Sequence, residues 1–222
     1  DRLVIAFDPA HIGRMARYEK ALRQRAYLLS EESGDAAWVQ SIEAILAETA
    51  VAVTAARQML IRDLNQEAEK GWLGFPGVEL SLVGDTEQWL ADMPALQVED
   101  KLMAEAKTAR LAGDLAMPGP HVSELQAVHL ASKTPAYLAS TGQQKALLIA
   151  VVMAHARLQE RRLGRSPIML LDDVAAHLDA DRRHALFEAV SLLGGQCWYS
   201  GSDQQQFEDL RGKAQFIEMR PA

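Results

Sequence analysis

The 222-residue sequence contains a single cysteine, Cys197. One cysteine cannot close a disulfide within the chain, and this scarcity suits a reducing compartment. We therefore expect a cytoplasmic protein whose fold depends on packing and hydrogen bonding, without covalent cross-links.

The sequence also has no evident signal peptide or membrane-spanning segment. The most continuous apolar stretch, Ala146 to Ala154, has nine residues, whereas a transmembrane helix needs roughly 20. We therefore expect no membrane partner. The chain begins with Asp1, and residues 3–7 look like an apolar strand already under way, so we expect a piece of a longer protein.

A surplus of positive charge is missing too. Lys and Arg total 23 against 30 Asp and Glu, a formal net charge of −7. This balance excludes a non-specific nucleic-acid binder that relies on its overall charge, so any contact with DNA must come from a local patch or from outside this sequence. Hydrophobic residues make up 49%, which is enough for a soluble globular protein of one or two domains.

The phosphate-binding P-loop pattern G-x-x-x-x-G-K-[ST] does not occur. The only Gly-Lys pair, Gly212-Lys213, lacks both the earlier glycine and the hydroxyl residue. Because a P-loop supplies the backbone cradle and the lysine that hold a triphosphate, this chain alone is expected to bind a nucleoside triphosphate poorly or not at all.

A short polar segment precedes the most apolar helix of the sequence. It consists of Ser140, Thr141, Gly142 and Gln143. Either hydroxyl can cap the helix, and Gln143 or Gln144 three residues later can complete a capping box. A helix N-terminus with glycine, hydroxyls and amide side chains is suited to binding phosphate. The helix itself is expected to be buried on most sides.

Two adjacent acids follow the apolar run Ile168 to Leu171, which is typical of a buried parallel strand. Asp172 and Asp173 stand at the carboxyl end of this strand, where open α/β sheets bind their ligands. One acid can hold a hard cation such as Mg²⁺ through water, and the other can orient or deprotonate an attacking water. A third acid, Asp179, follows six residues later.

These segments resemble a known family. STGQQK resembles the signature loop of ABC-type ATPases, IMLLDD their Walker B strand and AAHLD their D-loop. The residues in these three motifs are similar to those of the RecF family of bacterial DNA repair and recombination ATPases, which are relatives of the SMC-type heads. PGPHVSEL resembles the family's Gly-Pro-His-Arg segment, and the opening DRLVIAFDPAH and closing GKAQFIEM also fit. The resemblance runs from end to end.

The resemblance implies a role for each site residue. Ser140, Thr141, Gly142 and Gln143 would contact the γ-phosphate of ATP held by the other subunit of a dimer. Asp172 would hold the Mg²⁺ shell and act in catalysis with Asp173, which would polarise the attacking water. Asp179 would be the D-loop acid that crosses the dimer interface.

The resemblance also implies a function for the complete protein. It would form an ATP-dependent homodimer around DNA at gaps and single-/double-strand junctions, and support replication, recombinational repair and the SOS response, with RecR and RecO as partners. The family's Walker A motif would lie upstream of this sequence, so ATP hydrolysis would need the longer protein. Two alternatives remain open: another ABC-type ATPase, such as a transporter subunit, and a helical interaction module without nucleotide binding of its own.

Four positions depart from the motifs. Asp173 stands where ABC-type ATPases usually have Glu, and Ala176 stands where the D-loop usually has Ser. Ser202 lies roughly where transporter-type ATPases have the switch His, and Val122 replaces the Arg of the Gly-Pro-His-Arg segment. A shorter carboxylate at 173 is compatible with slow hydrolysis.

The first part of the chain is predicted to form two helices. Apolar residues recur at helical spacing from Ile12 to Leu29, and a longer helix from Ala36 to Glu69 has a soft heptad seam. A turn at Ser33-Gly34 joins the two helices. The first helix has five basic residues, Arg14, Arg17, Lys20, Arg23 and Arg25. These residues could bind the phosphates of a nucleic-acid backbone, or they could form an ordinary solvent-exposed face of the helix.

The fold class that we predict is α/β: the C-terminal lobe of an ABC/SMC-type ATPase head with a helical, coiled-coil-like arm. We place the arm at residues 1–75 and the strand/helix segment with the ATPase lobe at residues 76–222. Strands and helices alternate over residues 165–219, which indicates a parallel sheet. Ala214 to Met219 is predicted as a last edge strand.

Overall fold

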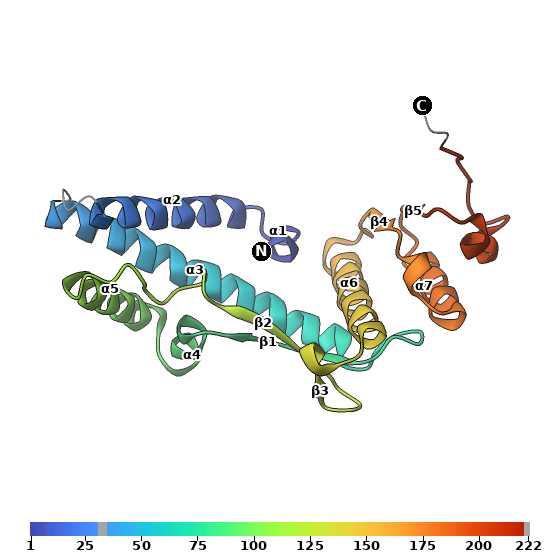
Figure 1. Cartoon of the computed structure of the whole chain (residues 1–222), viewed down its shortest axis with the longest axis horizontal. Helices are drawn as coiled ribbons and strands as arrows, with labels where there is room; N and C mark the ends of the chain where they lie inside the picture. Colours follow the sequence, from blue (N-terminus) through green and yellow to red (C-terminus); the bar gives the residue numbers. More distant parts are fainter. Residues whose placement is uncertain (31–34, 220–222) are drawn as a thin grey trace. The chain divides into compact units, whose positions relative to one another are not determined.

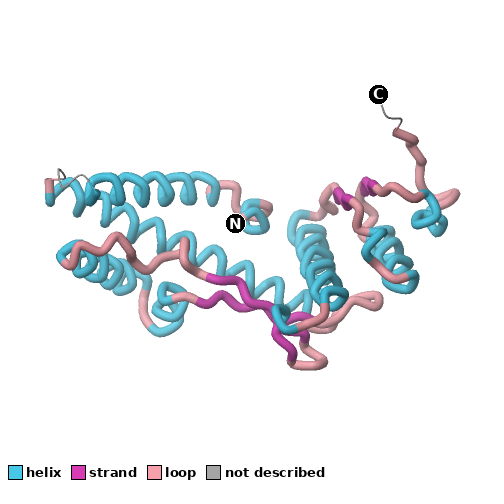
Figure 2. The backbone as a smooth tube through the Cα atoms, viewed as in Figure 1, coloured by secondary structure: helices cyan, strands magenta, loops and turns pink. Residues whose placement is uncertain are grey.

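The computed structural model describes residues 1–30 and 35–219, so the predicted turn at Ser33-Gly34 lies outside the described residues. The chain divides into two compact units: Asp1–Asp63 with Leu80–Gln126, and Leu64–Glu79 with Ala127–Ala222. Figure 1 labels the elements, and Figure 2 shows how much of the chain is helical. The predicted functional division at residue 75 remains a prediction, since compactness alone sets these unit boundaries.

The first unit is built from helices. They are α1 (Arg2–Ile5), α2 (His11–Ser30), α3 (Ala36–Ala68), α4 (Asp85–Asp92) and α5 (Ala95–Leu111), of which α3 continues into the second unit. The two predicted arm helices are present as α2 and α3. The expected strand at residues 3–7 is wrong, because the N–H groups of Phe7 and Asp8 donate to the carbonyl of Val4 and close a helical turn.

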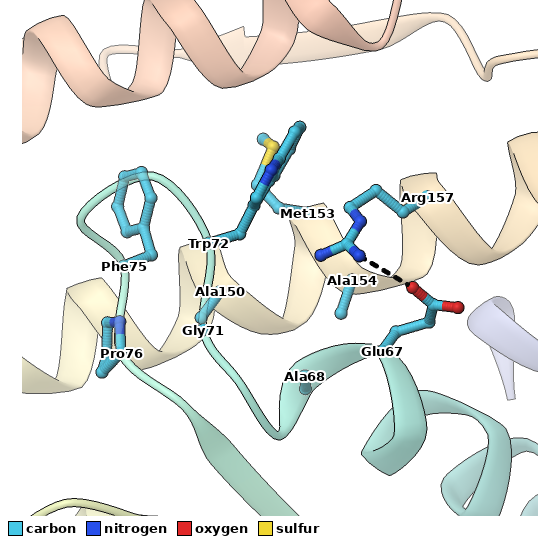
Figure 3. A pocket seen from close by; sticks show the side chains of 10 residues that line it. All are labelled: Glu67, Ala68, Gly71, Trp72, Phe75, Pro76, Ala150, Met153, Ala154 and Arg157. Carbon is cyan, nitrogen blue, oxygen red and sulfur yellow. Dashed lines mark ion pairs between the residues drawn. The ribbon is translucent and has the colours of Figure 1, made fainter.

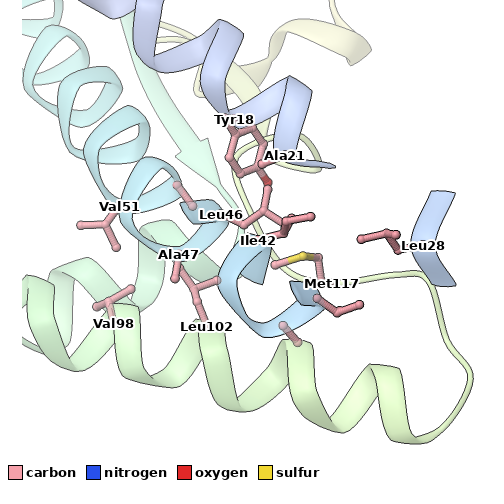
Figure 4. Close-up of a cluster of buried hydrophobic side chains, with 13 residues drawn as sticks. Tyr18, Ala21, Leu28, Ile42, Leu46, Ala47, Val51, Val98, Leu102 and Met117 are labelled. Atoms are coloured by element: carbon pink, nitrogen blue, oxygen red, sulfur yellow. The ribbon is translucent and has the colours of Figure 1, made fainter. Parts of the chain in front are cut away.

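Helices α2, α3 and α5 share one hydrophobic core (Figure 4). The predicted heptad positions Val39, Ile42, Leu46 and Val53 are all buried. Thr49 is tolerated in the seam because its hydroxyl donates to the carbonyl of Ile45 at 2.6 Å. A third helix belongs to the same core: α5 contributes the buried residues Val98, Leu102 and Ala106.

A buried ion pair joins the same three helices. Arg25 of α2 and Glu43 of α3 have side chains only 1% and 2% exposed, and their Nε and Oε1 atoms are 3.2 Å apart. Arg25 also donates to the carbonyls of Leu115 at 2.8 Å and Ala106 at 3.1 Å, and Arg110 of α5 lies 3.3 Å from the same Glu43 oxygen. Every charge in this group therefore has a partner, as burial requires.

The arginines of α2 do not form an open positive face. Arg25 is buried, Arg14 is ion-paired with Asp8, Arg17 lies 3.1 Å from Glu48, and Arg23 lies 3.7 Å from Glu19. These pairings favour the solvated-face interpretation over a phosphate-tracking helix.

Helix α3 qualifies the expectation that no segment could cross a membrane. Among the described residues, α3 is long enough and apolar enough to cross a membrane, judged by length and composition alone. Of its most apolar 18-residue window, 44% is buried inside the structure. Its 33 residues span roughly 50 Å. A core helix passes the same test, and α3 packs its apolar face into the shared core and contains the paired Glu43.

The second unit contains the predicted parallel strands. Its remaining elements are β3 (Thr134–Pro135), η1 (Ala136–Leu138), α6 (Thr141–Leu163), β4 (Met169–Asp172), η2 (Ala175–His177), α7 (Ala180–Leu192), β5 (Cys197–Ser200) and η3 (Gln204–Leu210). Strands β4 and β5 pair in parallel, with Leu170 opposite Trp198 and Asp172 opposite Ser200. Strands β1 (Val78–Val83) and β2 (Glu124–His129), which have residues in both units, form a second sheet with β3 in the order β1-β2-β3.

Aromatic residues form the small core beside β5. The Phe187 ring of α7 meets the Tyr199 ring edge-on at 5.2 Å and lies 6.1 Å from the Phe207 ring. Ala175 completes the buried cluster. This packing holds α7 and η3 against the end of the sheet that carries the acids.

One expectation about the second unit is corrected and one is confirmed. Residues 215–219 have no regular secondary structure, so the predicted edge strand is wrong; a strand needs a neighbour to accept and donate its ladder bonds. Helix α6 is buried on most sides, as expected: the consecutive residues Met153 to Ala156 are all buried, and Leu148, at 64%, is the one exposed residue of the continuous apolar run.

We predict that Glu43→Ala lowers the free energy of unfolding by about 3–5 kcal/mol, because it leaves the buried Arg25 charge unpaired. The matched control is Glu48→Ala on the same helix, which removes the exposed pair with Arg17 and should cost less than about 1 kcal/mol. Urea unfolding of both variants measures the difference. Equal costs would show that the buried pair has no special role in stability.

Candidate functional site

The polar segment before α6 is a complete capping box. Ser140 is the N-cap: its Oγ accepts from the N–H of Gln143 at 3.3 Å, and the Gln143 Oε1 accepts from the N–H of Ser140 at 3.0 Å. Gln144 supports the turn by donating to the carbonyls of Ala136 and Ala139 at 2.9 and 3.2 Å. Of the alternatives left open by the sequence, Ser140 and Gln143 form the box.

This capped end retains donors for an anion. The N–H groups of Thr141 and Gly142 belong to the first helical turn, where no intrahelical acceptor exists. The Ser140 hydroxyl acts as acceptor in the box, so its proton can be donated to an oxygen outside the helix. Together with the positive end of the α6 dipole, these groups can bind a phosphate oxygen.

The two strand-end acids are organised by a serine on the neighbouring strand. The Ser200 hydroxyl donates to Oδ1 of Asp172. The N–H of Asp173 lies 3.2 Å from both the carbonyl oxygen and the Oγ of Ser200. Asp173 has a left-handed backbone with φ of 50°, a conformation that Asp tolerates better than most residues. The chain therefore turns sharply after Asp172, and both acids stay exposed.

These acids fit the Mg²⁺ that the resemblance implies. Asp172 presents a hard carboxylate at an exposed strand end, with Oδ1 oriented by Ser200. Mg²⁺ is commonly held by one or two carboxylates together with waters and substrate phosphates. In the described ranges, no group of three or more His, Cys, Asp or Glu side chains is placed to hold a metal ion. A site of this kind therefore depends on water and phosphate for its other ligands.

The D-loop acid is the N-cap of α7. Oδ1 of Asp179 accepts from the N–H of Arg182 at 2.8 Å. The Arg182 side chain lies with Nε 3.7 Å from Oδ2 of Asp179 and donates from Nη1 to the carbonyl of Gly142 at 3.4 Å. The structure thus ties the D-loop segment to the signature segment.

One face of the β4–β5 sheet is open and apolar. Leu170 and Trp198, opposite each other in the register, are 75% and 51% exposed, and Ile168 beside them is 64% exposed. Parallel sheets normally have both faces covered. Since β-strand side chains alternate, Asp172 and Ser200 lie on this same face.

The cavity beside α6 is too small for a nucleotide. It measures about 10 Å³ and lies between the loop at residues 71–76 and α6 (Figure 3), a volume that holds about one water. Glu67 closes it through ion pairs with Arg157 at 3.2 Å and Arg161 at 2.6 Å, and the Arg157 guanidinium lies 5.0 Å from the centre of the Trp72 ring.

The chain is similar to curated proteins named "DNA replication and repair protein RecF". It is 42% identical to the one from Mesorhizobium japonicum over 222 residues and 39% identical to the one from Rhizobium meliloti. In both comparisons 98% of this chain is covered, but only 59% of the relative. The chain therefore spans about three fifths of the length of these relatives.

Solved structures give the same result for the fold. The recombination mediator protein RecF-ATPrS in the RecFOR pathway matches with a TM-score of 0.72 over 92% of this chain and 57% of its own, at 18% identity. The RecF-ATP structure matches with a TM-score of 0.71. No family model matches the chain.

The chain is RecF-like along its whole length. The resemblance read from the motifs is thus confirmed, and so is the predicted fold class, an α/β ATPase-head lobe with a helical arm. The chain is related to DNA replication and repair proteins. The roles of its individual site residues remain predictions.

The RecF-like Gly-Pro-His segment lies in the first unit, bound to α2 and α3. The Tyr18 hydroxyl and Nδ1 of His121 are 2.6 Å apart, and Arg57 donates to the carbonyl of Pro120 at 2.6 Å. Gly119 is needed here, because a Cβ would lie 2.3 Å from the Tyr18 hydroxyl. The Gly-Pro-His segment is therefore held in place by contacts within the first unit.

Sequence reasoning missed two residues that contact the RecF-like motifs. Ser200 orients Asp172, and Arg182 joins Gly142 to Asp179. Neither belongs to a motif, and each contact depends on tertiary packing. A weak signal existed for Ser200, because a polar residue ends the strand that was expected to pair with the acid-bearing strand.

We predict that Ser140→Ala lowers the free energy of unfolding by about 1 kcal/mol, because the capping box is lost. Ser140→Asp should retain nearly wild-type stability, since Asp caps a helix as well as Ser. Denaturant unfolding of this chain measures both. If Ser140→Ala has no effect, then the box contributes nothing to the stability of α6.

We predict that acidification weakens the first unit through His121. Burial lowers the pKa of His121 and raises the pKa of Tyr18 well above its ordinary value, so the Tyr18 hydroxyl donates to neutral imidazole. A histidine whose folded pKa is lowered contributes stability above its unfolded pKa of about 6.5, and loses it as the pH falls from that value through the lower pKa of the folded state.

The free energy of unfolding should therefore begin to fall at about pH 6.5 and keep falling at lower pH, down to the lowered pKa of the folded state. The free energy of unfolding of His121→Gln, which keeps a neutral hydrogen-bond acceptor at this position, should fall less over the same pH range. Urea unfolding at each pH measures both slopes, and identical slopes would rule out His121 as the titrating group.

Proposed function

We propose that this chain is the arm and C-terminal ATPase portion of a RecF-like protein that binds ATP and DNA, dimerises on ATP through the signature loop and supports recombinational repair of single-strand gaps. The observation that carries the proposal is the N-terminus of α6. Its capping box, Ser140 with Gln143, is exposed and lies beside the N–H donors of the first helical turn. An end of this kind suits a phosphate delivered by another subunit.

The signature loop acts by charge and hydrogen bonding. The Ser140 hydroxyl and the N–H groups of Thr141 and Gly142 bind the γ-phosphate of ATP held by a second copy, and the Gln143 amide borders it. Because these donors are already oriented by the box, little ordering is needed when the phosphate arrives. ATP then joins the two copies.

The strand-end acids act on the nucleotide of their own subunit. Asp172, oriented by Ser200, holds the hydrated Mg²⁺, which when bound neutralises charge on the phosphates. Asp173, turned outward by its left-handed backbone, orients the attacking water. Asp179 reaches the interface from the start of α7.

The open sheet face is where we place the P-loop part of the protein. Leu170, Trp198 and Ile168 form an uncovered apolar surface, and this chain covers 59% of its relatives. Packing of the P-loop part on this face would bury the apolar side chains and bring the P-loop to the edge that carries Asp172 and Asp173.

DNA is bound by the dimer and not by this chain alone. The net charge is −7, and the arginines of α2 are buried or ion-paired. The solved relatives are named as recombination mediators of the RecFOR pathway. That naming supports a role in DNA recombination; gapped DNA as the target, RecR and RecO as partners and the cytoplasm as the location are part of our proposal.

The test is sedimentation velocity of the complete protein, with its P-loop part, with and without ATP and Mg²⁺. Wild type should dimerise only with ATP. Ser140→Arg and Ser140→Asp should both stay monomeric, the first by steric block and the second by repulsion of the phosphate. The Asp variant is decisive because Asp preserves the helix cap.

Ser191→Arg is the matched control, since Ser191 is exposed on the last turns of α7, and it should dimerise like wild type. Normal dimerisation of both Ser140 variants would sink the proposal. A wild-type protein that stays monomeric with ATP would favour the interaction module instead.

A further inference from the structure

Arg182 connects the two segments that face the second copy in the proposed dimer. It lies in the first turn of α7, where its N–H donates to Oδ1 of Asp179 at 2.8 Å. Its side chain extends toward α6 and donates to the carbonyl of Gly142 at 3.4 Å, with Nε 3.7 Å from Oδ2 of Asp179. One guanidinium therefore lies between the signature loop and the D-loop acid.

We propose that Arg182 is a positioning residue that makes the signature loop and the D-loop one surface for the partner copy. This inference rests on the proposed function, because it assumes that both segments meet a second copy. It adds a residue outside the motifs and gives it two tasks, one geometric and one electrostatic.

The geometric task is to keep the starts of α6 and α7 in register. A guanidinium presents several donors in a rigid plane, so it can contact the Gly142 carbonyl and the Asp179 carboxylate together, whereas lysine offers a single flexible point charge. The phosphate donors of the loop and the D-loop thereby hold a constant spacing.

The electrostatic task is to neutralise Asp179 beside a polyanion. In the proposed dimer the Asp179 carboxylate comes close to the triphosphate, and the two repel each other more strongly as water leaves the interface. The Arg182 charge offsets this repulsion. Because the Arg182 side chain is 36% exposed in the chain alone, its ion pair adds little to monomer stability. Its effect should appear when the second copy covers it.

The experiment compares Arg182→Ala, Arg182→Lys and Arg183→Ala in the complete protein. Sedimentation velocity gives the ATP concentration at half-maximal dimerisation. Arg182→Ala should raise it roughly tenfold or more, as expected for losing one charge-assisted contact, with Arg182→Lys in between. Arg183 is the matched control, because it lies next in α7 and its side chain donates to the carbonyl of Leu178 at 3.5 Å, away from Gly142. The Arg183→Ala variant should behave like wild type.

Two further readouts separate positioning from general stability. The unfolding temperature of the nucleotide-free Arg182→Ala protein, and its affinity for ATP as a monomer, should both match wild type. Asp179→Asn should restore part of the dimerisation lost in Arg182→Ala, because the repelling charge is gone. If the effects of Asp179→Asn and Arg182→Ala on dimerisation simply add in the double variant, the electrostatic task is contradicted.

The outcomes distinguish this inference from the proposed function. If Arg182→Ala dimerises like wild type while Ser140→Asp does not, the inference is wrong and the proposed function stands. If Ser140→Asp also dimerises normally, the proposed function itself fails. If Arg182→Ala loses dimerisation only in step with its unfolding temperature, Arg182 is a structural residue and the inference is overturned.

Discussion

The N–H groups at the first turn of every helix need acceptors from outside the helix, and the candidate site is built on that requirement. Ser140 caps α6 and Asp179 caps α7. In both places the N-cap residue belongs to a RecF-like motif. The residues that begin these two helices are therefore also the residues that face the partner in the proposed dimer. The caps satisfy only part of each first turn, which leaves donors for a phosphate at α6. Stability and binding thus use the same few atoms.

The first unit shows how a charged core supports the helical arm. Burying Arg25 and Glu43 is unfavourable unless every donor and acceptor has a partner, and here Arg110 and two backbone carbonyls complete the set. This arrangement demands that α2, α3 and α5 keep one register. The first unit is therefore built on three helices with a directional polar contact inside their apolar core.

The second unit combines a well-packed side with an exposed one. Aromatic rings pack between α7, β5 and η3, while Leu170 and Trp198 face outward. An exposed apolar surface on a parallel sheet is a binding surface in most proteins. Because Asp172 and Ser200 are on the same face, whatever covers the apolar residues also lies beside the acids.

The sequence by itself determined the features that depend on near neighbours. The helix start at Ser140, the acids after β4, the heptad seam of α3 and the RecF-like motifs are all local patterns, and the structure has each of them. Only the tertiary structure decided which distant residues meet. Ser200 reaches Asp172 because β4 and β5 pair in parallel, and Arg182 reaches Gly142 because two helix starts lie side by side. Residues 3–7 and 214–219 have strand-like composition, but composition cannot supply the neighbouring strand that a ladder requires.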